Sequence, residues 1–491
     1  MTKTVKYYSS EDAGAPQLLQ TGWGHMVNLY RTLCDGYNEK LVESIIYNAS
    51  TKLVKINFTE SGHGFRRYQT IKVTANTTQY DNKELFVINA ADKFIECQSK
   101  SIFTESLITG TLKVRVAPLG LIHAYNDGFN KSAFRFPTET NEDPTYLVIN
   151  DTEPTQFAWN KNSMCATPSV YMCKNLQSID GQGENIVPFS STYPEAYRAG
   201  EWKDTGVRNF WSYGLMHLLY QGNFGGSGFT VNNTAIASTS VKWVLIGNED
   251  YHYLYVWPNV SNYYSLVPLL YSFGKYIPKI EGDQFNYIFN ATYNYQQNRA
   301  STSYSQYHFY QSVTTGTAEW LHINASGCNN IFTSFKLSTN KNNRPPLVGT
   351  AINDYAATEV IGLKGISVNT DVDLFLRSRK YASSSYSGNG GETWPPFDGK
   401  IKISRVDIYE NITTIERGTM RGIYWIHHYQ PFLDRSIIKI TDENNRSFYA
   451  LCMKNAASPQ STAWSYSGAA NIEPTYYSYV LISLDEKDWN E

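Results

Sequence analysis

The sequence predicts a mainly β protein of several domains, built as β-sandwiches or barrels, with a small α+β domain at the N-terminus. Short runs rich in Val, Ile, Tyr and Phe recur along the chain between turn residues, which is typical of antiparallel sheets. Only one stretch has a strong helical period. The length of 491 residues suits two to four domains, and a hydrophobic content of 42% is enough to fill their cores.

Residues 1–118 are expected to form the first domain, which would dock the protein on a larger assembly. Apolar residues recur at helical spacing over residues 26–34, with Thr21 as the expected N-cap and Gly36 as the stop signal. We expect this helix to pack on a small sheet or barrel that Pro118 closes. The strands of that sheet are predicted at residues 41–46, 53–58, 71–74, 85–88 and 112–116.

Residues 119–380 are expected to form a central, mixed but mainly β domain. Its clearest strands are residues 146–149, 241–246 and 251–257. The glycine-rich stretch at 222–230 has no Gly-Lys-Ser/Thr ending, so we interpret it as a surface loop and not as a phosphate-binding loop.

Aromatic residues gather at two places in this central domain. Strict alternation puts the first group, Tyr251, Tyr253, Tyr255 and Trp257, on one face of a strand. The second group is Tyr304, Tyr307 and Tyr310. Two interpretations stay open: these rings pack in a core or against another subunit, or they form a platform for a ligand such as a glycan.

Residues 381–491 are expected to form a C-terminal β domain after a loop rich in Ser and Gly at 382–394. A charged tail over residues 485–488 follows the last strand. The strands of this domain are predicted at residues 400–409, 422–426, 436–441, 447–451 and 479–482.

The composition argues against several classes of partner. A net charge of −2 leaves no basic excess for nucleic acid, and no apolar run is long enough to span a bilayer. The first residues lack the apolar core of a signal peptide, so we expect synthesis and assembly in a cytosol. The six cysteines form no CxxC pair and are interpreted as isolated thiols. The 38 tyrosines suit a protein that makes many polar and aromatic contacts.

No motif identifies catalytic chemistry. The nine histidines form no HExxH or HxH pattern, so we predict no metal site and no cofactor. Asp371 and Asp373 lie on one face of an extended segment and could bind Ca²⁺ or serve glycoside hydrolysis, although a solvated strand end is the simpler interpretation. Arg417 and Arg421 flank the residues Gly-Thr-Met and could bind an anion or a facing carboxylate, or form an ion pair with another chain.

Three stretches of the sequence resemble a family of virion proteins of tailed bacteriophages. The first is KYYSS at 6–10 with GAPQL at 14–18, GWG at 22–24 and LCDGY at 33–37. The second is WVLIG at 243–247 with YHYLY at 251–255 and SFGKY at 272–276. The third is ERGTMRGIYWIHH at 416–428, similar to an Arg-Gly-x-x-x-Gly-Leu/Ile-Tyr stretch of the family.

This resemblance implies a structural component of the virion, in the tail, neck or baseplate, and no catalytic residues. We therefore expect a non-enzymatic protein that forms a ring, collar or sheath-like layer as a symmetric homo-oligomer with other virion proteins. A receptor- or carbohydrate-binding protein of the tail, in contact with a host surface glycan, is the alternative. A glycan depolymerase that uses Asp371 and Asp373 is a third possibility.

Overall fold

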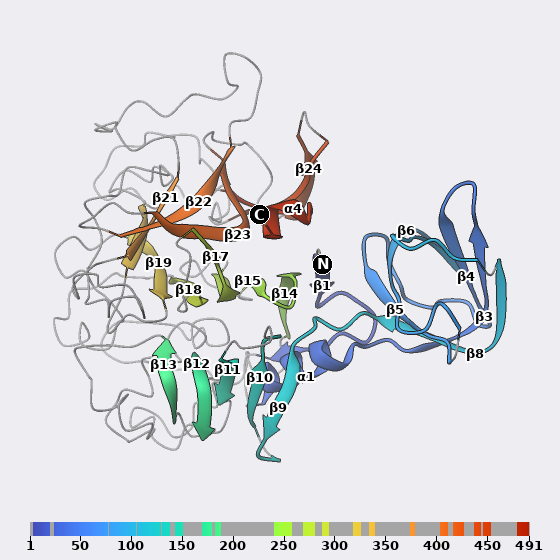
Figure 1. Cartoon of the computed structure of the whole chain (residues 1–491), viewed down its shortest axis with the longest axis horizontal. Helices are drawn as coiled ribbons and strands as arrows, with labels where there is room; N and C mark the ends of the chain where they lie inside the picture. Colours follow the sequence, from blue (N-terminus) through green and yellow to red (C-terminus); the bar gives the residue numbers. More distant parts are fainter. Residues whose placement is uncertain are drawn as a thin grey trace, which may run out of the picture.

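The computed structural model confirms a mainly β fold with several sheets, a closed barrel and few helices (Figure 1). All strand pairs of the described residues are antiparallel, as the short runs and turns predict. The described residues are 3–19, 24–76, 78–104, 106–128, 130–137, 143–150, 169–178, 182–187, 240–257, 269–279, 287–293, 318–325, 333–338, 374–378, 403–410, 416–426, 437–442, 445–452 and 479–490.

A closed barrel projects from the rest of the molecule, at the right of Figure 1, in the strand order β3-β4-β7-β6-β5-β8. Alternate side chains of each strand point inward and fill the barrel. In β4, for example, Val54, Ile56 and Phe58 are buried, and the residues between them are partly exposed. All five predicted strands are present, and β7 was not predicted. The barrel strands are β3 (Lys40–Asn48), β4 (Leu53–Phe58), β5 (Thr70–Thr74), β6 (Glu84–Ala91), β7 (Phe94–Gln98) and β8 (Leu107–Val116).

Helix α1 (His25–Asp35) has a glycine directly before it and another directly after it. Its N-cap is Gly24, with φ 83° and no side-chain cap, so the prediction of Thr21 as the cap is wrong. The predicted stop is confirmed, because Gly36 has φ 77° and donates its backbone N–H to Thr32 O at 2.8 Å.

The helix does not pack on the barrel sheet, which corrects the sequence-based expectation. It packs mainly on β2 (Leu18–Leu19) and on three strands of a separate five-stranded sheet, β9, β10 and β11, and its Tyr30 also contacts His252 of the largest sheet. That sheet has the order β13-β12-β11-β10-β9, and β9 is exposed along its whole length. Its strands are β9 (Ile122–Asn126), β10 (Lys131–Arg135), β11 (Thr145–Asn150), β12 (Ser169–Ser178) and β13 (Gln182–Val187).

The largest sheet has eight strands and begins with the N-terminal strand, in the order β1-β14-β15-β16-β18-β19-β20, with β2 also paired to β14. It therefore joins residues that are more than 200 positions apart in the sequence. Its strands are β1 (Lys6–Ser9), β2 (Leu18–Leu19), β14 (Ser240–Gly247), β15 (Tyr251–Trp257), β16 (Leu269–Lys275), β18 (Tyr287–Tyr293), β19 (Ala318–Ala325) and β20 (Thr333–Ser338).

The third sheet carries the C-terminal residues in the order β21-β22-β23-β26-β25-β24, with β17 paired to β23. The short helix α4 (Lys487–Asn490) lies against β23 in the position of the predicted charged tail. The strands of this sheet are β17 (Ile277–Pro278), β21 (Leu374–Ser378), β22 (Ile403–Glu410), β23 (Glu416–Ile426), β24 (Ile437–Thr441), β25 (Ser447–Cys452) and β26 (Tyr479–Ser483).

The pairing crosses two of the predicted domain boundaries. Strand β1 belongs to the large sheet although it lies within residues 1–118, and the barrel alone spans residues 40–116. Strand β21, which ends at Ser378, pairs with β22, so a boundary at 380 would cut through a sheet. Long-range pairing of this kind leaves no local mark in the sequence.

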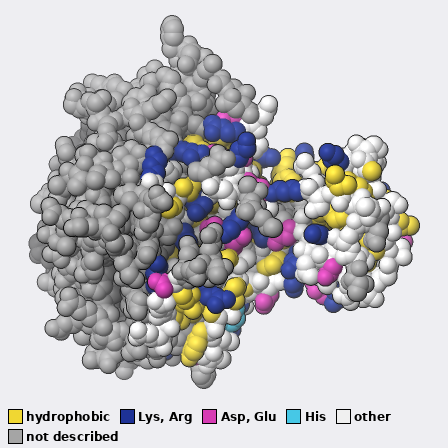
Figure 2. All heavy atoms as spheres, viewed as in Figure 1, with side chains coloured by type: hydrophobic (Ala, Val, Ile, Leu, Met, Phe, Trp, Pro, Cys, Tyr) yellow, Lys and Arg dark blue, Asp and Glu magenta, His cyan; other side chains and the backbone are white. Residues whose placement is uncertain are grey.

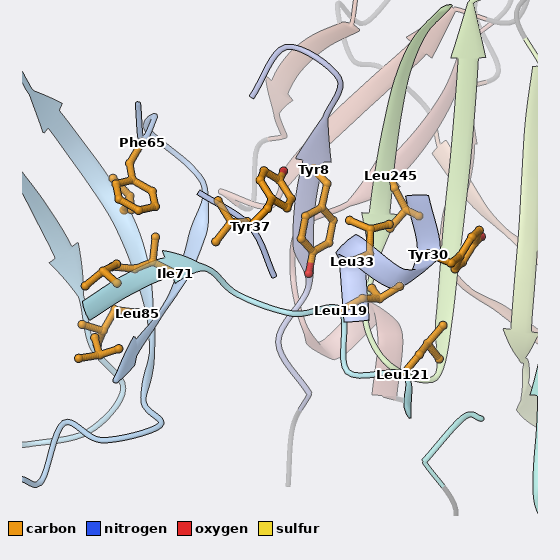
Figure 3. Close-up of a cluster of buried hydrophobic side chains, with 14 of the residues drawn as sticks. Tyr8, Tyr30, Leu33, Tyr37, Phe65, Ile71, Leu85, Leu119, Leu121 and Leu245 are labelled. Atoms are coloured by element: carbon orange, nitrogen blue, oxygen red, sulfur yellow. The ribbon is translucent and has the colours of Figure 1, made fainter. Parts of the chain in front are cut away.

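One continuous apolar core connects the barrel to the large sheet. Figure 3 shows Phe65, Ile71 and Leu85 on the barrel side and Leu33 and Leu245 on the other, with Tyr8 and Tyr37 between them. Backbone bonds from Val116 N to Tyr37 O (2.8 Å) and from Leu119 N to Leu33 O (2.7 Å) fix the same connection. The barrel is thus fastened to the body by packing as well as by the chain.

Candidate functional site

The first two stretches that carry the phage resemblance meet in one sheet. Strand β1 pairs with β14 from Lys6 opposite Gly247 to Ser9 opposite Val244. Strand β14 pairs in turn with β15, and β15 with β16. Residues of the N-terminal stretch therefore lie beside residues about 240 positions later in the chain.

The third stretch joins them through β17 and β23. Ile277 pairs with Thr419, and Pro278 pairs with Gly418. Side chains add two bonds: Tyr253 Oη donates to Arg421 O at 2.6 Å, and Arg421 Nε donates to Lys275 O at 2.6 Å. We call this region, formed by β1, β14, β15, β16, β17 and β23, the junction.

Two glycines allow the backbone of the junction to come this close. A Cβ on Gly274, where φ is 137°, would lie closer than 3.0 Å to Asp250 O. A Cβ on Gly422, where φ is 65°, would lie closer than 3.0 Å to Trp489 Cε2. Both positions combine a left-handed backbone with a contact that no other residue type would fit. The junction is therefore a tightly packed joint between two sheets.

The aromatic face of β15 is part of this joint and is not a surface. Tyr251, Tyr253 and Tyr255 are all 0% exposed. Tyr251 Oη donates to Ser272 Oγ at 2.9 Å, and the ring of Tyr253 packs edge-on against Trp489 at 5.8 Å between centroids. The core interpretation is therefore correct for these three residues. The prediction that they contact a glycan or another subunit is wrong, because the chain itself covers them.

The predicted interface charge at Arg421 is also used inside the chain. Besides Lys275 O, its guanidinium donates from Nη1 to Trp489 O. Burial lowers the pKa of this arginine, and the nearby Asp250 acts in the opposite sense. The side chain therefore fastens β23 to β16 and α4, which leaves it unsuited to an ion pair with another chain. Arg417 lies in β23, but its side chain is outside the described residues.

Asp488 anchors the C-terminal helix to the sheet, a feature that the sequence analysis missed. Its Oδ1 accepts bonds from Tyr424 Oη at 2.5 Å and from Arg405 Nη2 at 3.2 Å, and its Oδ2 accepts one from Ser483 Oγ at 2.5 Å. Burial, and then the bond to Asp488, raise the pKa of Tyr424 to about 12. The neighbouring Trp489 is fully buried, and a tryptophan directly after the charged tail was the signal in the sequence.

His252 lies on the opposite face of β15 and connects it to α1. Its Nε2 is 2.9 Å from Tyr30 Oη, and its ring lies among the rings of Phe136, Phe273 and Tyr30. Nδ1 has no hydrogen-bond partner. Burial lowers the pKa of this imidazole to about 3, so the ring is neutral at neutral pH. A neutral histidine in an aromatic core suits packing.

A polar network fastens the barrel at its base. Asp12, which is almost fully buried, accepts bonds from Ser9 N, Tyr37 Oη and the guanidinium of Arg66. Lys6, 4% exposed, donates to Glu84 Oε1 at 2.7 Å and to Pro118 O at 2.6 Å. These bonds involve both the N-terminal strand and the barrel, so they hold the barrel in a fixed orientation.

Exposed apolar side chains of the described residues gather at two places, and Figure 2 shows hydrophobic atoms on both the projecting barrel and the lower body. Ile122 and Tyr125, each 44% exposed, lie on the edge strand β9. The remaining four lie on the barrel, in β3, in β8 and in the loop before β8. They are Leu41 (62% exposed), Ile46 (40%), Ile102 (75%) and Leu107 (58%).

Several predicted residues fall outside the described part of the chain. Trp257 lies in β15, but its side chain is not described. Among the described residues, no group of His, Cys, Asp and Glu could hold a metal ion, and no helix is long and apolar enough to cross a membrane. Outside the described residues lie Tyr304, Tyr307, Tyr310, Asp371 and Asp373.

Comparison with known proteins adds no relative. No model of a protein family matches the chain, and no curated protein matches it. The phage resemblance therefore depends on the three stretches themselves and on their positions in the fold.

Proposed function

We propose that this chain is a non-enzymatic structural protein of a tailed-bacteriophage virion. In this proposal it forms a ring, collar or sheath-like layer of the tail, neck or baseplate. It assembles in the host cytoplasm as a symmetric homo-oligomer in contact with other virion proteins.

The convergence of the three stretches at the junction is the observation that carries this proposal. They are separated by roughly 200 and 140 residues in the sequence, yet they are joined by strand pairing at β1–β14 and β17–β23. Short similarities scattered by chance have no reason to lie in one packed joint. A fold shared with the phage family would place them together, because such a joint restricts which residues fit.

The way the junction uses its side chains supports a structural role. Tyr253, Arg421 and Asp488 all bind other parts of the same chain. The burial of Tyr251, Tyr253 and Tyr255 also removes these residues from the alternative role in carbohydrate binding. The described residues also expose four large apolar side chains on the projecting barrel, which suits a protein that contacts others.

Mass spectrometry of purified particles tests the proposal. Particles of the phage that encodes the chain are banded on a density gradient, and the copy number of the chain is measured against that of the major capsid protein. We expect the chain in the particle band at a fixed copy number. Its absence from the particles would overturn the proposal, and a soluble host protein measured in the same band is the control for contamination.

A further inference from the structure

Tyr68 occupies a backbone position on the barrel where a tyrosine is unusual. It is the third residue of a tight turn over residues 66–69, in which Gln69 N donates to Arg66 O at 3.4 Å. Its φ is 74°, in the left-handed region that turns usually fill with Gly or Asn. Its own N–H donates to Val87 O of β6 at 2.7 Å, which fixes this backbone. A bulky residue is strained here, and such strain persists only where surrounding contacts hold it.

The ring of Tyr68 contacts the C-terminal sheet. Nζ of Lys439, in β24, lies 3.8 Å from the centre of the ring, and Cζ of Arg67 lies 4.7 Å from it. At these distances a cation is attracted to an aromatic ring. Lys439 is exposed and Tyr68 is half-buried, so the contact lies at the surface. The strained turn therefore presents its ring to a charge on a different sheet.

Two further side-chain contacts join the same parts of the molecule. The rings of Tyr7 in β1 and Tyr449 in β25 are 4.6 Å apart between centroids. Lys100, in the loop after β7, forms an ion pair with Glu486, which directly precedes α4. Figure 1 shows β24 at the end of the C-terminal sheet that faces the barrel. We call these two contacts, together with the contact between β24 and the ring of Tyr68, the clasp.

The clasp is separate from the strand pairing and from the main core. In the part of the chain that the structure describes, no barrel strand pairs with a strand of the C-terminal sheet. The apolar core that connects the barrel to the large sheet likewise contains no described residue of the C-terminal sheet, although Ile423, Phe448 and Leu481 of that sheet are buried. The clasp can therefore open without unpairing a strand and without exposing that core.

We propose that the clasp is a conformational device, which holds β24 and β25 against the barrel and opens reversibly while the barrel and the junction stay folded. The structure describes the closed state. Opening would let the turn at Tyr68 relax to a more usual backbone, so the strain favours the open state and the three contacts favour the closed state. Strain of this kind and a cation–π contact are similar in magnitude, which keeps the two states close in free energy. This inference concerns the chain alone and does not depend on the proposed function.

Hydrogen exchange of the full chain tests the proposal, because amides exchange when their local structure opens. The exchange of peptides from β24 and β25 is measured by mass spectrometry. We expect Tyr68→Ala to speed this exchange by about two- to thirtyfold, the factor that corresponds to one cation–π contact. Tyr68→Phe is the matched control: it keeps the ring and should exchange as the wild-type chain does. No change in Tyr68→Ala, or an equal change in Tyr68→Phe, would overturn the proposal.

A glycine at the same position tests the role of strain. Tyr68→Gly removes the ring and also the strain of the closed state, because Gly adopts positive φ readily. It should therefore speed the exchange of β24 and β25 less than Tyr68→Ala does. Exchange as fast as in Tyr68→Ala, or faster, would show that strain does not drive opening.

A double variant tests whether the two sides act through one contact. Lys439→Met removes the charge from the partner and should speed exchange as Tyr68→Ala does. Because either change removes the same contact, the variant with both should exchange no faster than the faster of the two single variants. Peptides of β4 and β15 report on the barrel and the junction and should exchange equally in all variants. Additive effects, or faster exchange in β4 and β15 as well, would contradict a local clasp.

Discussion

Acid should weaken the packing of helix α1 on the large sheet through His252. The ring is fully buried among aromatic side chains, and burial lowers its pKa to about 3. An exposed histidine in the unfolded chain has a pKa of about 6.5. Below pH 6.5 the unfolded chain therefore binds a proton that the folded chain does not, so stability is full above pH 6.5 and is lost as the pH falls toward about 3.

The magnitude follows from the two pKa values. Each pH unit within this window costs about 1.4 kcal/mol, so the contribution lost between pH 7 and pH 5 is about 2 kcal/mol. The variant that removes the titration with the least disturbance is Tyr30→Phe with His252→Phe. It replaces both partners of the 2.9 Å bond by rings of similar shape and leaves no buried hydroxyl without a partner.

The assay is urea unfolding at pH 7 and pH 5, followed by tryptophan fluorescence. Trp243 is buried in β14 next to β15 and donates its indole N–H to Pro16 O at 3.1 Å, so it reports on this part of the fold. The wild-type chain should lose about 2 kcal/mol more than the double variant between the two pH values. Equal losses in the two proteins would show that protonation of His252 does not destabilise the fold in acid.

Three further substitutions compare the packed joint at the C-terminus with an exposed ion pair on the surface. Gly422→Ala should lower the stability by about 3 kcal/mol or more in a thermal melt, because the new Cβ would overlap Trp489 where φ is 65°. Asp488→Ala should cost about 3 kcal/mol in the same assay by removing the shared acceptor of three bonds, and limited proteolysis should then release α4. Lys113→Ala, which breaks only the exposed pair with Glu39, should change the melting temperature by less than the equivalent of about 0.5 kcal/mol.

The helix and all but one of the barrel strands could be predicted from the sequence because their signals are local. Alternation of apolar residues gave β15 its correct bounds, and glycine placed the end of α1 at Gly36. The start of α1 was missed because Gly24 replaces the usual polar cap. Strand β7 was missed because its run, Phe94–Gln98, is short and mixed in polarity.

The positions of the elements could not be predicted, because they depend on pairing between distant residues. Nothing near Lys6 indicates that its strand pairs with residues 244–247. The same limit explains the aromatic face of β15: alternation put Tyr251, Tyr253 and Tyr255 on one side, but the cover over them comes from β16, β23 and α4. Buried polar groups such as Asp12 and Asp488 were missed for the same reason.

Cryo-electron microscopy of the intact particle is the sharpest test of a structural role in the virion. The chain is placed in the map by its side-chain density, with the junction and the projecting barrel as the features to recognise. A structural role predicts copies in a symmetric ring or layer at the tail, neck or baseplate. Particles whose map has no density for the chain, or has it only as isolated copies at the distal tip of the tail, would contradict a structural role.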